Sequence, residues 1–133
     1  GNLSINNPEG EQSEEYLRTH GRSSMALSPI YFDFDQAGIR GDMQPLITSN
    51  ADYLKENPHT TIVIEGNCDE RGTNEYNLAL AERRAINVKE YMDNLGVQPG
   101  RIRTVSYGEE RPLFTGSNEL DWSQNRRADS ILE

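Results

Sequence analysis

Residues 62–96 hold a short apolar segment followed by a long amphipathic one, and the step between them is sharply marked. Residues 62–64 are all β-branched, which is typical of a buried strand. A polar loop over residues 65–72 follows, and Thr73 is suited to cap a helix. Apolar residues then recur at helical spacing until Gly96, a good helix terminator. The stretch therefore predicts a strand–loop–helix unit around which the rest of the chain must fold.

Three further segments extend this pattern. Residues 30–34 alternate between apolar and polar side chains, which predicts a strand, and Asp42 can cap a helix after it. Residues 101–107 predict another strand, and residues 125–132 are suited to a closing strand after a long loop. The order β-α-β-α-β-loop-β predicts an α/β sheet layered against helices, with parallel pairing through right-handed crossovers.

A chain of 133 residues suits one domain and is too short for two well-buried ones. Residues 1–28 are rich in Asn, Ser, Gly and Glu and lack apolar periodicity. They are predicted to form a flexible tail or linker, in which residues 14–18 could make a short helix. Order is expected to begin at Pro29, so residues 29–133 are predicted to be the folded domain.

The net charge of −9 argues against a nucleic-acid partner, because phosphate binding needs a basic surface. No apolar run approaches the roughly 20 residues that span a bilayer, and no signal segment opens the chain. Because the chain begins with Gly1 rather than Met, we expect that a targeting segment has been removed.

Enzymatic motifs are not evident in the sequence. Cys68 is the only cysteine, which excludes an internal disulfide, and neither His20 nor His59 lies near it in sequence. Paired acidic residues are more simply explained as a solvated surface than as a glycosidase pair. Metal-ligand spacings and phosphate-binding loops are not found either. The chain is therefore predicted not to be an enzyme.

Asp69 and Arg84 are the candidate binding residues that the strand–loop–helix unit offers. A guanidinium holds a carboxylate through parallel hydrogen bonds, and a carboxylate accepts several bonds from an ammonium. Together the two side chains would suit a small zwitterion with both groups. The alternative is that they form surface ion pairs with each other or with neighbours such as Arg71 and Glu82. Sequence spacing alone leaves both interpretations open.

Residues 65–85 read E-G-x-x-D-E-R-G-T-x-E-Y-N-x-x-L-x-x-R-R-A, residues 31–35 read Y-F-x-F-D, and residues 125–128 read N-R-R-A. This pattern resembles the OmpA-like peptidoglycan-binding domain and, within it, the peptidoglycan-associated lipoprotein branch. The match runs from about residue 31 to residue 127. It implies an α+β sandwich in which a mixed four-stranded sheet has helices packed on one face.

The resemblance also implies a site. In the family, the residues matching Asp69 and Arg84 bind the meso-diaminopimelate side chain of the peptidoglycan stem peptide. The other residues that match the family's pocket or lie beside it are Phe34, Asp35, Asn77 and Leu80, with Asn67, Arg126 and Arg127 as further candidates. The chain departs from the family at Cys68, usually Ala or Thr, at Asn67, often His, and in a more polar last strand over residues 128–133.

The function implied by the resemblance is non-covalent binding of peptidoglycan, without a cofactor or metal. The family anchors the outer membrane to the cell wall from the periplasmic side and works with Tol system proteins such as TolB in envelope integrity and division. Its lipid anchor would sit on a cysteine upstream of Gly1. Two alternatives remain from the residues: an acidic domain that binds a periplasmic protein through a diverged pocket, and a wall hydrolase.

Overall fold

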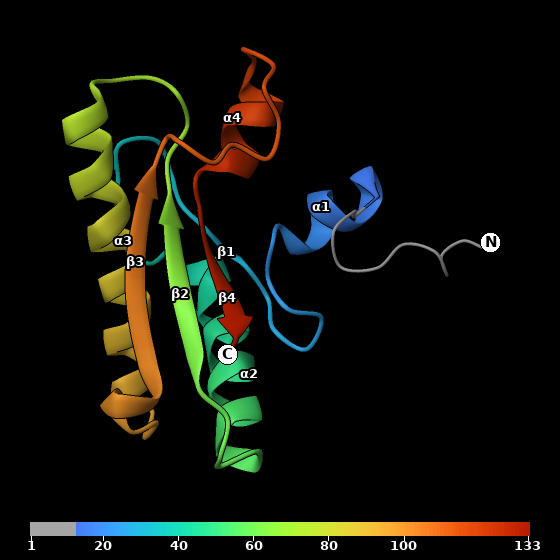
Figure 1. Ribbon diagram of the computed structural model, residues 1–133, viewed down its shortest axis with the longest axis vertical. Coiled ribbons are helices and arrows are strands. Elements are labelled where there is room, and N and C mark those ends of the chain that lie inside the picture. The colour runs from blue at the N-terminus through green and yellow to red at the C-terminus, as the bar shows by residue number, and fades with distance from the viewer. Residues whose placement is uncertain (1–12) are drawn as a thin grey trace.

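The computed structural model describes residues 13–133 of the chain (Figure 1). A four-stranded sheet lies at its centre, with helices packed on it and near its edges. In chain order the elements are α1 (Glu14–His20), β1 (Ile30–Tyr31), the 3-10 turn η2 (Gly41–Met43), α2 (Gln44–Glu56), β2 (Ile62–Asn67), α3 (Asn74–Asn94), the 3-10 turn η3 (Pro99–Arg101), β3 (Ile102–Gly108), α4 (Glu119–Asn125) and β4 (Arg127–Leu132).

The sheet has the strand order β1-β4-β2-β3. β2 and β3, which α3 connects along the chain, pair in parallel, as sequence analysis predicted. β4 is antiparallel to both of its neighbours, β1 and β2. The sheet is therefore mixed and four-stranded, as the resemblance implied. The parallel pairing predicted for the strand–helix–strand units is found for β2 and β3 but not for β1 and β2, because the last strand of the chain inserts between β1 and β2.

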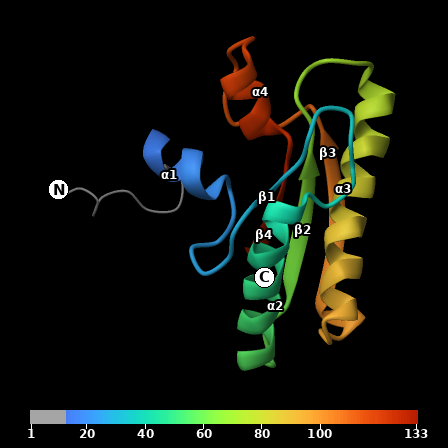
Figure 2. The same ribbon diagram turned by 180° about the vertical axis from the view of Figure 1, so that it is seen from behind.

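The hydrophobic core lies between the sheet and two helices, α2 and α3, which cover the same face of it. Figure 2 shows both helices in front of the strands when the molecule is viewed from behind. Within residues 13–133, no helix is both long enough and apolar enough to cross a bilayer. The side chains that the core encloses completely include Ile30, Phe32, Ile47, Leu54, Ile62, Ile64, Val88 and Met92.

Gly66 allows α3 to pack directly on β2. A Cβ atom at this position would overlap the carbonyl group of Ala81, which belongs to the backbone of α3. Since a backbone carbonyl cannot swing aside as a flexible side chain does, the helix would have to move away from the strand. That helix carries side chains into the candidate site, so this contact sets where they lie.

We expect Gly66→Ala to lower the free energy of unfolding by roughly 1–3 kcal/mol, the usual cost of overpacking a core. Urea denaturation monitored by circular dichroism measures the loss. Gly38→Ala is the matched control, because a Cβ atom there would meet nothing within 4 Å. Equal stability of the two variants would show that the close contact between α3 and β2 is not needed.

The predicted flexible tail does not fit residues 13–28, which pack against the sheet. α1 begins after Ser13, whose side chain accepts a hydrogen bond from the Tyr16 amide at 3.1 Å. Leu27 is only 1% exposed and belongs to the main core. The rest of the predicted tail, residues 1–12, lies outside the described residues. We propose that the folded unit begins near Ser13 rather than at Pro29.

Two serines of this segment cover the edge of β4 beyond the short strand β1. The Ser24 amide donates to the Ser130 carbonyl at 3.0 Å. In return, the Ser130 amide donates to the Ser23 hydroxyl at 3.1 Å and the Leu132 amide donates to the Ser24 hydroxyl at 2.9 Å. An open strand edge is a site for unwanted pairing. Ser23 and Ser24 therefore complete the edge that β1 leaves uncovered.

The contact between β4 and the N-terminal segment also explains why the last strand is polar. Asp129 is fully buried, accepts from the Arg127 guanidinium at 2.7 Å, and accepts from the Ser23 hydroxyl at 3.1 Å. Gly21 lies so close to Asp129 and Arg127 that a Cβ atom on Gly21 would collide with the Asp129 carboxylate. The carboxylate can be buried because its partners come from β4 itself and from the N-terminal segment.

Candidate ligand-binding pocket

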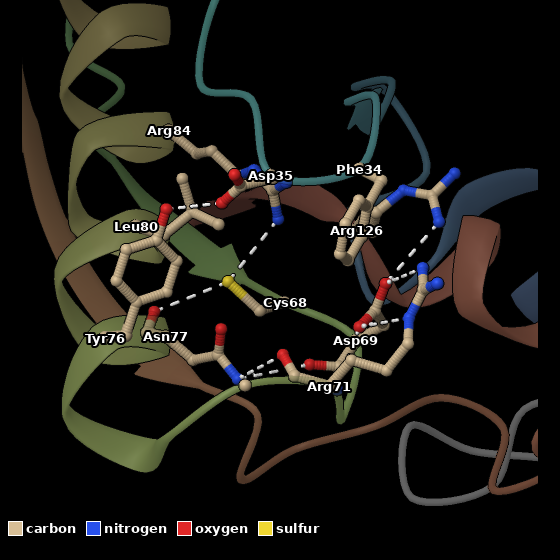
Figure 3. Close-up of a pocket in the computed structure, with 11 residues that line it drawn as sticks. Phe34, Asp35, Cys68, Asp69, Arg71, Tyr76, Asn77, Leu80, Arg84 and Arg126 are labelled. Carbon is tan, nitrogen blue, oxygen red and sulfur yellow. Dashed lines mark hydrogen bonds and ion pairs between the residues drawn. The ribbon is translucent and has the colours of Figure 1, made fainter.

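A pocket of about 250 Å³ opens where the carboxyl end of β2 meets the first turns of α3. The segment after β1 and the residue before β4 complete its wall. Figure 3 shows the lining side chains arranged around a common space. These residues are Phe34, Asp35, Cys68, Asp69, Arg71, Gly72, Tyr76, Asn77, Leu80, Arg84 and Arg126.

Arg84 enters the pocket from α3, and its side chain is completely buried. Its guanidinium donates to three backbone carbonyls: Gln36 at 2.8 Å, Asn67 at 2.9 Å and Asp33 at 3.0 Å. It also donates to the Cys68 sulfur at 3.4 Å. Burial lowers the pKa of this guanidinium from its usual value. Arg84 thus ties the end of β2 to the segment after β1.

None of the carboxylates of residues 13–133 forms a salt bridge with Arg84, whose acceptors are all uncharged. Buried charges in proteins are normally paired, because removing an ion from water costs several kcal/mol. A guanidinium that is enclosed, lines a pocket and lacks an ionic partner is suited to receive an anionic group from a ligand.

Asp69 lies across the pocket from Arg84 and is paired with two other arginines (Figure 3). Arg71 donates to it through its backbone amide at 3.0 Å and its guanidinium at 2.8 Å, and Arg126 approaches at 3.4 Å. Burial acts to raise the pKa of the Asp69 carboxyl, but hydrogen bonds from Arg71 and Arg126 outweigh it and hold that pKa below its usual value. Asp69 is thus paired with its neighbour Arg71, but this is not a surface ion pair, because the Asp69 carboxylate is only 3% exposed.

Asn77 and Cys68 fix the backbone around these charges. The side-chain amide of Asn77 donates to the Arg71 carbonyl at 3.1 Å and to the Glu109 carboxylate at 2.6 Å. The Cys68 thiol donates to the Asn77 carbonyl at 3.4 Å. Burial raises the pKa of this thiol to about 11, although the charge of Arg84 acts in the opposite direction. Cys68 therefore stays protonated at neutral pH and does not supply a thiolate nucleophile.

Two aromatic side chains, Phe34 and Tyr76, line the pocket, and a third, Trp122, contacts the lining residue Arg71. Tyr76 donates its hydroxyl to the Asp35 carboxylate, and this hydrogen bond raises the pKa of the Tyr76 phenol. Asp35 has a positive φ of 59°, a conformation that Asp tolerates better than most residues. The Arg71 guanidinium lies 4.0 Å from the ring centres of both Phe34 and Trp122. Arg71 is thus held by two rings while its charge faces Asp69.

Most of the residues predicted for the site lie together in this pocket; the exceptions are Asn67 and Arg127. The Asn67 side chain donates to the Glu65 carbonyl, and only its backbone carbonyl reaches Arg84. Arg127 pairs with Asp129 instead, beneath the N-terminal segment. The pocket residues that sequence analysis did not single out are Cys68, Arg71, Gly72 and Tyr76.

Because the pKa of Asp69 is lowered in the folded protein, its charge stabilises the fold at neutral pH. This contribution is present above the usual pKa of 3.8 and is lost as the pH falls through the lower folded value. We expect Asp69→Asn to flatten the dependence of the free energy of unfolding on pH below about pH 4. Urea denaturation at several pH values, with the exposed Asp52→Asn as control, measures the difference. Identical slopes for Asp69→Asn and the parent would contradict this assignment.

Comparison with known proteins places these features in a family. Residues 31–127 match the model of the OmpA family. A peptidoglycan-associated lipoprotein of Pasteurella multocida is 50% identical over 99 residues, which cover 74% of this chain and 66% of the relative. One from Brucella melitensis is 47% identical over 103 residues, 77% of this chain and 61% of the relative. The chain thus spans less than two thirds of the length of these relatives.

Solved structures also resemble this chain. The crystal structure of the peptidoglycan-associated lipoprotein from Burkholderia pseudomallei has a TM-score of 0.77 and 45% identity, and the match covers 79% of this chain and 89% of that one. The C-terminal domain of Helicobacter pylori MotB reaches a TM-score of 0.75 at 22% identity, over 80% of this chain and 84% of that one, and shows likeness of fold only. The chain belongs to the OmpA family.

Proposed function

We propose that this domain binds peptidoglycan non-covalently by taking the diaminopimelate side chain of a stem peptide into the pocket. One observation carries the proposal: Arg84 is buried at the pocket and has no carboxylate partner among residues 13–133. A ligand carboxylate would supply the missing charge through charge-assisted hydrogen bonds. The similarity to proteins named as peptidoglycan-associated lipoproteins supports peptidoglycan as the ligand.

The ammonium group of the ligand would meet a carboxylate across the pocket from Arg84. Asp69 lies there, whereas Asp35, which also lines the pocket, lies beside Arg84 and is bonded to Tyr76 (Figure 3). Because Asp69 is already bonded to Arg71 and Arg126, an ammonium group would share or replace one of these contacts. Arg71 is the side chain more able to move, because its side chain is 33% exposed whereas that of Arg126 is 7% exposed. A ligand with both a carboxylate and an ammonium therefore matches the pocket better than a simple anion.

In this proposal the domain is a binding module and not an enzyme. It would hold the cell wall from the periplasmic face of the outer membrane, to which an upstream lipid would attach it. Tol system proteins such as TolB are the proposed protein partners. The buried, protonated thiol of Cys68 fits a binding role, since it places no nucleophile in the pocket.

Titration with a stem peptide that contains meso-diaminopimelate tests the proposal. The parent is expected to bind it, and to bind the corresponding lysine-containing peptide more weakly, because lysine lacks the second carboxylate that Arg84 would hold. Equal affinity for the two peptides would contradict the role of Arg84. If the parent binds neither peptide and does not sediment with insoluble peptidoglycan, the proposed function is wrong.

We expect Asp69→Asn to weaken binding of the same peptide by about tenfold to a hundredfold, because one charge-assisted contact with the ammonium group is lost. Isothermal titration calorimetry measures the change. The exposed carboxylate of Asp52 on α2 provides the control, since Asp52→Asn makes the same chemical change far from the pocket lining. An affinity of Asp69→Asn equal to that of the control would remove Asp69 from the binding site.

A further inference from the structure

We infer that residues 13–24, here called the N-terminal strap, position two arginines of the pocket, Arg71 and Arg126, by holding the segment 111–125 against them. Arg18 and Arg22 are the positioning residues through which the strap acts. The inference rests on the proposed function for its effect on affinity, whereas the contacts themselves are independent of it.

The strap grips the outer side of segment 111–125 at several points. Arg18 donates to the Asp121 carboxylate at 3.2 Å, and its guanidinium lies 3.8 Å from the ring centre of Phe114. Arg22 donates to the Arg111 carbonyl at 2.8 Å and to the Pro112 carbonyl at 3.0 Å. A residue pair from the N-terminal end of the described chain thus fixes a loop about 90 residues later.

The inner side of the same segment contacts the charged residues of the pocket. Trp122 stacks on the Arg71 guanidinium at 4.0 Å, and its indole N–H donates to the Glu70 carboxylate at 3.4 Å. Glu119 accepts from Arg126 at 2.9 Å, and Arg126 in turn contacts Asp69 at 3.4 Å. Segment 111–125 therefore holds both of the arginines that face Asp69.

Segment 111–125 has little regular structure of its own to keep it in place. Its one helix, α4, has seven residues, and a helix this short is not stable in isolation. Within the segment, Asn125 accepts from the Leu113 amide at 2.7 Å and Asp121 accepts from the Gly116 amide at 3.0 Å. These hydrogen bonds lie within the segment. The bonds from Arg18 and Arg22 attach it to the N-terminal strap.

A looser segment should therefore weaken binding without any change to a residue that lines the pocket. When segment 111–125 does not hold Arg71 and Arg126 in their binding positions, part of the binding free energy is spent on ordering these two side chains. Losing the ionic and stacking contacts of Arg18 and the two hydrogen bonds of Arg22 is expected to change the affinity by about threefold to tenfold. The strap thus contributes to the affinity of the pocket from outside it.

Trp122 is the only tryptophan of the chain, so its fluorescence reports directly on segment 111–125. The test compares the parent with Arg18→Ala/Arg22→Ala. In the ligand-free variant we expect acrylamide to quench Trp122 more strongly than in the parent, and we expect the dissociation constant of the diaminopimelate-containing peptide to rise about threefold to tenfold. Circular dichroism confirms the fold, and Arg18→Ala alone replaces the double variant if that variant does not fold.

Lys55→Ala/Lys89→Ala is the charge-matched control, because it also removes two cations and one helical ion pair, Lys89 with Asp93, away from the pocket lining. Unchanged quenching and affinity in the strap variant, or equal changes in the control, would overturn the inference. If the parent itself does not bind the peptide, the proposed function is at fault. The quenching measurement then still decides whether the strap holds segment 111–125 in place.

Discussion

An Arg84→Ala variant is expected to lose more than about a hundredfold in affinity for a diaminopimelate-containing peptide, because truncating one side of a buried charge pair costs several kcal/mol. We also expect it to unfold more easily, by roughly 3 kcal/mol, since the carbonyls of Asp33, Gln36 and Asn67 lose their donor inside the protein. Calorimetric titration and urea denaturation measure the two effects. Arg84 is therefore expected to matter to the fold as well as to the ligand.

The neighbouring arginine provides the control for both measurements. Arg83 lies next to Arg84 on α3 but is exposed. Arg83→Ala should change the stability by less than about 0.5 kcal/mol, as is usual for surface positions. An Arg84→Ala variant that keeps the affinity of Arg83→Ala would show that the ligand carboxylate does not meet this guanidinium. Arg84→Lys adds a further test, because lysine keeps the charge but cannot donate to three separated carbonyls.

A chain that begins at Pro29 is expected to be less stable than one that begins at Ser13 by roughly 4 kcal/mol. Exposing Leu27 and losing its burial accounts for about 1.5–3 kcal/mol, and each lost hydrogen bond to the β4 edge adds about 0.5–1.5 kcal/mol. For a domain of this size the thermal midpoint should fall on the order of 15 °C. Differential scanning calorimetry of the two chains measures the change.

Limited proteolysis gives an independent view of the same segment. Trypsin is expected to cut slowly after Arg18 and Arg22 in the chain that begins at Ser13, because both side chains are bonded to segment 111–125. Rapid cleavage at these two arginines, or a thermal midpoint that is unaffected by starting at Pro29, would support a flexible tail over residues 13–28 instead.

The parts of the fold that sequence analysis predicted correctly depend on local chemistry. Thr73 does cap α3 by accepting from the Tyr76 amide at 3.1 Å, and Gly96 follows the end of that helix with a φ of 106°. The expected cap at Asp42 did not form, since Asp42 pairs with Arg40 and a 3-10 turn precedes α2. Helix α4 was not expected, because it is short and lies in what reads as a loop.

The N-terminal segment could not be predicted from its own sequence. Residues 13–28 offer few apolar side chains, so their composition is that of a tail. The composition of the last strand, read alone, is too polar to predict a buried position. Each becomes reasonable only beside the other, because Ser23 meets Asp129 across 106 positions of the chain. A single sequence does not show such a long-range polar match.

Within the pocket, sequence predicted which side chains gather but not how their charges pair. Arg84 bonds to backbone carbonyls, which every residue carries and which leave no mark in the sequence. Arg71 lies two residues after Asp69 and was considered as its ion-pair partner, but not as a residue of the site. Its stacking on Trp122 depends on a loop some 50 residues away, and only the folded chain reveals it.

Packing of residues 13–28 also bears on how far the domain can reach. A fully extended chain covers about 3.3–3.6 Å per residue, so sixteen residues in a free linker would span roughly 55 Å. Once these residues lie along β4 and segment 111–125, that length is no longer available as a spacer. For a domain proposed to bridge a membrane and a cell wall, the gap it can cross is then set by whatever chain lies before residue 13.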